Sequence, residues 1–72
     1  METLTVEEIA RHYLAAMDSV NLLNAGQPEG MSDEDWADTV SRNVEHLRIV
    51  VERDYMQDQD LAPFNEAIAA HG

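Results

Sequence analysis

The sequence contains no cysteine and no lysine, and only three glycines and two prolines occur in its 72 residues. Without cysteine the chain forms neither disulfides nor thiolate zinc sites, which are common supports of small domains. Without lysine, four arginines oppose fifteen acidic residues, and the formal net charge is −11. Nucleic acid and anionic membranes repel such a chain, so we expect basic surfaces, cations or further copies of itself as partners.

Long apolar runs are missing as well. The longest stretch of large apolar residues is IVV, residues 49–51, so nothing is expected to span a membrane. The start, METLTVEE, lacks the basic region and apolar run of a targeting signal. Nevertheless 44% of the residues are hydrophobic, more than disordered compositions contain. We therefore expect one small folded domain over residues 1–72.

A first helix is predicted over residues 5–24. Thr5 is a good N-cap and Glu8 stands three positions later, which is the pattern of a capping box. Apolar residues then recur at helical spacing, and the expected core side consists of Val6, Ile9, Tyr13, Met17 and Val20, widened by Leu14 and Leu23. The stretch NAGQPEG, with two glycines and a proline, should end the helix.

The stretch MSDEDWADTV, residues 31–40, repeats this pattern and predicts a second helix over residues 32–54. Ser32 is the expected N-cap, and Met31 with Trp36 the expected hydrophobic staple. Three acids at positions 33–35 occupy the first turn, where the helix dipole favours negative charge. The acid cluster thus has a sufficient structural explanation, and Trp36 is expected in the core rather than on a ligand platform.

A short third helix is predicted over residues 60–70. Asp60 is its expected N-cap, and Pro63 is tolerated in a first turn because that amide has no helical acceptor. Leu61, Phe64 and Ile68 form its apolar side. The predicted fold is all-α, an antiparallel helical hairpin with a short third helix lying across it, which makes a small three-helix domain.

Catalytic motifs are not found, and we expect neither an enzyme nor a cofactor. No serine follows a glycine elbow, and no phosphate-binding loop occurs. Glu8 and His12 are four residues apart and could meet a third ligand, such as His46, but a solvated pair is the preferred interpretation. Acids at positions 54, 58, 60 and 66 resemble a calcium loop only loosely, because the turn glycine is absent. No metal site is therefore predicted.

The stretch from residue 42 to 70, RNVEHLRIVVERDYMQDQDLAPFNEAIAA, resembles the C-terminal half of small acidic helical proteins of tailed phages and prophages. The likeness rests on Asn43, His46, Leu47, Asp54, Asp60, Leu61, Pro63, Asn65, Ala67 and Ile68. An aromatic pair often precedes the acidic turn in those proteins, whereas Tyr55 and Met56 stand here. The resemblance implies a phage origin, beside head or tail genes, and a place in the virion or the host cytoplasm.

A partner-binding site is predicted at the end of the second helix and the third helix. Residues 49–51 are adjacent and apolar, so they point around more than half of a helix and a small core should leave part of them uncovered. The expected contact residues are Ile49, Val50, Val51, Met56, Leu61 and Phe64, rimmed by Glu52, Asp54, Asp58 and Asp60. The acids would steer a basic partner, and the apolar centre would hold it.

Two functions are compatible with these features. The first is a structural or assembly protein of a phage particle, associated with tail or head, which binds a protein partner or itself and does not bind nucleic acid or membrane directly. The alternative is a phage-encoded inhibitor that mimics nucleic acid on a basic host protein. Phosphate mimicry needs a continuous stripe of acids, whereas the unpaired acids are expected at the two ends of the second helix, about 30 Å apart.

Overall fold

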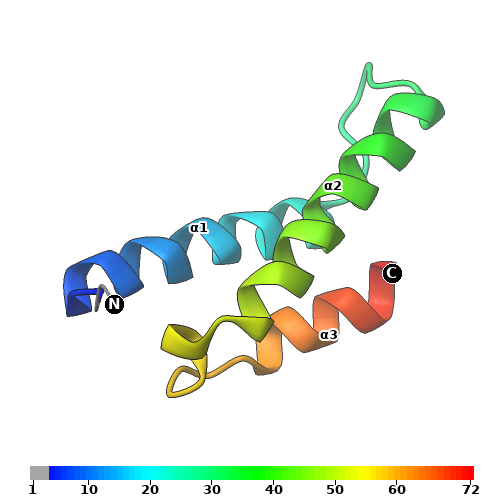
Figure 1. Cartoon of the computed structure of the whole chain (residues 1–72). Helices are drawn as coiled ribbons and strands as arrows, with labels where there is room; N and C mark the ends of the chain where they lie inside the picture. Colours follow the sequence, from blue (N-terminus) through cyan, green and yellow to red (C-terminus); the bar gives the residue numbers. More distant parts are fainter. Residues whose placement is uncertain (1–3) are drawn as a thin grey trace.

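The computed structural model describes residues 4–72, which form three helices and one short 3₁₀ turn (Figure 1). Helix α1 spans Val6–Ala25, α2 spans Asp33–Glu52, the turn η1 spans Asp54–Met56, and α3 spans Ala62–His71. Each of the three helices packs against the other two. The predicted all-α, three-helix domain is therefore confirmed.

The two long helices begin where their hydroxyl caps predict. The Thr5 hydroxyl accepts a hydrogen bond from the Glu8 amide, and the Ser32 hydroxyl accepts one from the Asp35 amide, both at 3.1 Å. Each bond satisfies one of the amides that a first helical turn leaves without a partner. At its other end α1 stops at Gly26, whose φ of +85° is strained for any residue with a Cβ.

The end of α2 and the start of α3 differ by one or two residues from the prediction. Helix α2 ends at Glu52, and the Gln57 side-chain amide donates to the carbonyls of Val51 and Arg53 at 2.9 Å each. Helix α3 begins at Ala62, whose amide donates to the Asp60 carboxylate at 3.1 Å. Asp60 therefore stabilises the start of α3, but the N-cap position itself belongs to Leu61.

The core lies where the three helices meet. Its buried members are Ala16, Val20, Leu23, Val44, Leu47, Val50, Met56, Phe64 and Ala67. Ala16 is fully buried although no apolar pattern singled it out, since a small side chain allows two helices to approach closely. Val6 and Leu14, both expected on the core side, are 84% and 64% exposed, so that part of the prediction is wrong.

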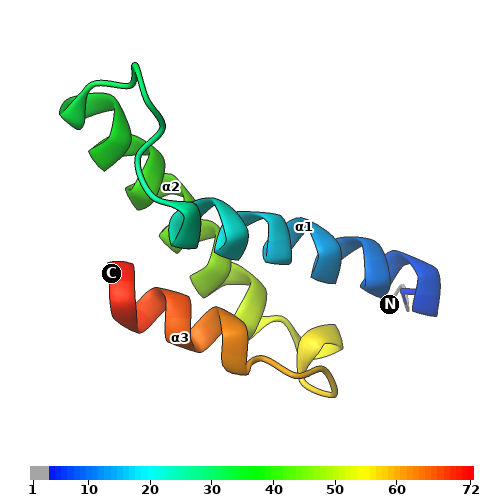
Figure 2. The same cartoon turned by 180° about the vertical axis from the view of Figure 1, so that it is seen from behind.

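The domain is elongated, measuring 43 × 20 × 19 Å along its principal axes. The first turns of α1 and of α2 lie at opposite ends, and both views show α2 extending past the other two helices (Figures 1 and 2). All buried side chains of α2 lie between Val44 and Val50, in its C-terminal half. Only the loop that connects α1 to α2 lies beside the first turn of α2.

Candidate docking surfaces

The apolar centre of the predicted docking site lies largely inside the chain. Val50 is buried, and Met56 and Phe64 are fully buried, so the expectation that the core leaves them uncovered is wrong. The reason is η1, which turns Met56 back under α1, and Tyr13, whose ring lies 5.0 Å from that of Phe64. These three side chains hold the domain together and are not accessible to a partner.

The remaining members of the predicted site are on or near the surface. Ile49 is 43% exposed, whereas Val51 and Leu61 are half-buried and pack against the core. The four acids of the rim, Glu52, Asp54, Asp58 and Asp60, are all exposed. The exposed members of the predicted site are therefore one isoleucine and four acids, a smaller apolar area than the sequence suggested.

The acidic connection between α2 and α3 is held by contacts with α1. The Asp60 carbonyl accepts a hydrogen bond from the Tyr13 hydroxyl at 3.0 Å, which ties the connection to α1. The His12 ring lies 5.3 Å from the Tyr55 ring and adds a second contact between α1 and η1. Asp60 thus has a structural role in addition to its charge.

The acid cluster at the start of α2 is also explained by local structure. Asp33, which follows the Ser32 cap, accepts a hydrogen bond from the Gln27 side chain at 3.0 Å. Trp36 is half-buried and lies outside the core cluster, so its predicted place in the core is wrong. The physical reason is that α1 and α3 do not reach the first turn of α2, and the loop at Met31 gives only partial cover.

A line of acids follows one side of α2, which the sequence interpretation missed. Glu34, Asp38, Glu45 and Glu52 are separated by four, seven and seven residues, spacings that keep side chains on one side of a helix. All four are exposed, and the line is about 27 Å long at 1.5 Å per residue. Asp38 pairs with Arg42 at 3.0 Å. The spacing of these acids in the sequence could have predicted the line, but the prediction placed the unpaired acids at the ends of the helix.

An apolar strip follows α1 along the border of its core side. We define this α1 strip as Val6, Ala10, Leu14 and Met17, which follow one another at intervals of four, four and three residues. Val6, Ala10 and Leu14 are exposed, and Met17 is half-buried at the border of the core. In both views the N-terminal turns of α1 extend past α2 and α3 (Figures 1 and 2).

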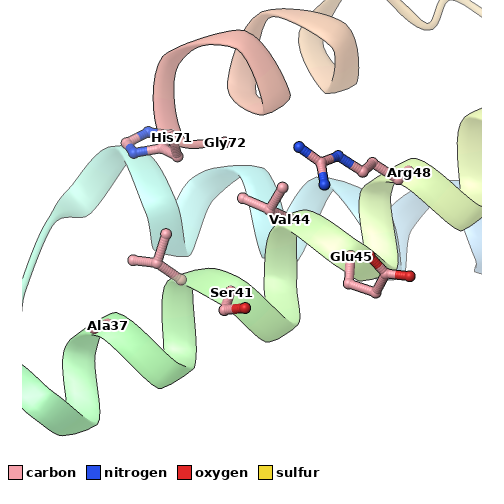
Figure 3. A pocket seen from close by; sticks show the side chains of 8 residues that line it. Ala37, Ser41, Val44, Glu45, Arg48, His71 and Gly72 are labelled. Atoms are coloured by element: carbon pink, nitrogen blue, oxygen red, sulfur yellow. The ribbon is translucent and has the colours of Figure 1, made fainter.

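A groove of about 390 Å³ lies between α2 and the C-terminal end of α3. It exists because the ten-residue α3 is half as long as α2. The floor is formed by Ala37, Val40 and Val44, and the polar lining by Ser41, Glu45, Arg48, His71 and Gly72. Arg48 reaches from α2 toward the end of α3 (Figure 3). The groove is open to solvent and combines a small apolar floor with one acid, one guanidinium and one imidazole.

The residues considered for metal binding do not form a site in the described part of the chain. Across residues 4–72 there is no group of three or more His, Cys, Asp or Glu side chains placed to hold a metal ion. Glu8 is half-buried, His12 faces Tyr55, and His46 is exposed on α2. The expectations of no metal, no cofactor and no catalysis stay predictions.

Searches against protein-family models, curated proteins and solved structures found no match to this chain. The resemblance to phage proteins over residues 42–70 therefore stays a prediction. Among the described residues, no helix combines the length and apolar character needed to cross a membrane.

Proposed function

We propose that the chain is a small acidic docking protein of a phage particle, associated with its tail or head. It acts by binding another protein or a further copy of itself. The observation that carries this proposal is the exposure of four large apolar side chains, Val6, Leu14, Leu22 and Ile49, on a chain of net charge −11. Exposed apolar groups gain free energy when a partner covers them, and surrounding acids select and steer a basic partner.

The phage assignment rests on the resemblance over residues 42–70, which supports an origin beside head or tail genes. The domain also suits a structural role, since the observed helix caps and core need no ligand for their construction. Because the domain is small, we expect it to act through its surface, as an adaptor or a stabilising subunit.

Quantitative mass spectrometry of purified virions tests the proposal. We expect the chain in the particle at a fixed ratio to the major head or tail protein, retained through density-gradient purification. Detection in infected cytoplasm alone, bound to a basic host protein and absent from virions, would overturn the structural role.

The line of acids on α2 favours a second candidate, an inhibitor that mimics nucleic acid. Four exposed carboxylates over about 27 Å could face the Arg and Lys side chains of a nucleic-acid-binding groove. Salt separates the two functions. Binding through phosphate mimicry should weaken by several decades between low and high ionic strength, whereas binding centred on apolar side chains should largely survive.

Ile49→Gln provides a matched test of the predicted site at the end of α2. The side chain is exposed, so the substitution should leave folding intact and weaken docking if Ile49 contacts the partner. Phe64→Ala is unsuitable for that purpose, because Phe64 is fully buried and its loss would unfold the domain.

A further inference from the structure

We infer that the α1 strip is a docking site for a basic amphipathic helix of another protein, an inference that rests on the proposed docking function. The strip contains the two most exposed large apolar side chains of the described residues. Val6 is 84% exposed and Leu14 is 64% exposed, and the buried residues of their helix begin only at Ala16. Single exposed apolar side chains are common on protein surfaces, but those of the strip follow one another in one line along the helix.

The dimensions of the strip fit a helix. Val6 and Met17 are eleven residues apart, which corresponds to about 16 Å along the helix axis. That length matches about three turns of a partner helix with apolar residues at intervals of three and four, the usual pattern of helix-in-groove recognition. Leu14 is at the centre of the exposed part, with Ala10 and Met17 one turn away on either side, so it is the expected anchor.

The charges around the strip determine the character of the partner. On the outer border, Asp18 is one turn from Leu14 and Glu7 is two turns from it, and both acids are exposed. On the core side, the Tyr13 hydroxyl donates to the Asp60 carbonyl, and the Asp60 carboxylate accepts a hydrogen bond from the Ala62 amide. One basic residue, Arg11, lies on the outer border. A helix with Lys or Arg beside its apolar side would therefore find the carboxylates of Glu7 and Asp18 along the outer border.

A second copy of this chain is a poorer occupant. Two chains of net charge −11 repel each other, and neither copy offers a lysine to the carboxylates at the border. The same argument disfavours an acidic or phosphate-bearing partner. Complementarity of both shape and charge is reached by a basic amphipathic helix.

The probe is a synthetic helical peptide with Leu at intervals of three and four residues and Lys on both sides of the Leu row. Its control has the same composition in scrambled order. Titration into the ¹⁵N-labelled full chain should shift the amide signals of α1 around Ala10 and Leu14 first. The scrambled peptide should bind at least about tenfold more weakly, since it keeps the charge and loses the apolar side.

Variants separate the strip from the rest of the surface. Leu14→Gln should lower affinity for the peptide about tenfold or more, while Ala69→Gln, a polar substitution at an exposed position on α3, should leave it unchanged. Glu7→Gln combined with Asp18→Asn should lower affinity at low salt and reduce its salt dependence.

Three results would overturn the inference. They are equal binding of the two peptides, peptide binding that Leu14→Gln does not weaken, and a dimer of the chain alone in sedimentation that Leu14→Gln abolishes. The first would mean charge attraction alone, the second a different surface, and the third a second copy as occupant. None of them changes the virion measurement, so the proposed function fails or stands separately.

Discussion

The two halves of α2 continue one apolar pattern but have different surroundings. In the C-terminal half, Val44, Leu47 and Val50 are buried between α1 and α3. In the N-terminal half, Trp36 and Val40 continue the same side of the helix and stay half-buried. The difference shows that periodicity sets the direction in which side chains point, while the neighbouring helices decide how far along that side the core extends.

The largest expected effect is in the C-terminal half. Leu47→Ala should lower the free energy of unfolding by about 2–5 kcal/mol, because Leu47 is fully buried and the cavity would lie among all three helices. Chemical denaturation followed by circular dichroism measures the change. Ser41→Ala, at an exposed position of the same helix, is the control and should be close to neutral.

Trp36→Ala tests the other half and should cost less, about 1–2 kcal/mol, because only part of the side chain leaves water on folding. Comparing this loss of unfolding free energy with that of Leu47→Ala measures the difference in packing between the two halves of α2. A loss equal to that of Leu47→Ala would mean that the core extends to the start of α2. Since Trp36 is the single tryptophan, its fluorescence in the parent chain also reports whether this half unfolds together with the core.

The start of α2 should respond to the loss of its cap. Ser32→Ala removes the acceptor of the Asp35 amide and should cost about 1 kcal/mol. Because tertiary contacts are few in this half, we expect faster hydrogen exchange at the first amides of α2 with little change around Leu47. Uniformly faster exchange along the whole helix would contradict the separation into two halves.

The smallest effect is expected on the exposed side of α2. Asp38→Asn breaks the ion pair with Arg42. The side chains of Asp38 and Arg42 are 61% and 79% exposed, so the loss of unfolding free energy should be about 0.3–0.5 kcal/mol. The cost should vanish in high salt, as thermal melts at two ionic strengths can measure. A larger, salt-resistant loss would mean that Asp38 contributes to packing as well as to charge.

The sequence predicted only part of the candidate docking surfaces. The acids Glu52, Asp54, Asp58 and Asp60 were expected on the surface and are exposed, since burying an unpaired charge is costly. Val50, Met56 and Phe64 were expected beside them and are buried. The reverse error occurred on α1, where Val6 and Leu14 were assigned to the core. Around a regular helix Leu14 is about 140° from Ile9 and about 120° from Val20, which were assigned to the same core side, so these angles could have indicated its exposure.

The sequence by itself determined the helical class, the acidic surface and the starting points of α1 and α2. These depend on composition and on hydrogen bonds between residues three positions apart, such as those to Thr5 and Ser32. Tertiary structure decided which apolar side chains form the core, where α2 ends, and which side of α1 stays open. Those outcomes depend on contacts between distant segments, such as Tyr13 with Asp60 and Phe64. A local pattern carries no information on them, because the same apolar spacing is stable whether a neighbouring helix or a partner covers it.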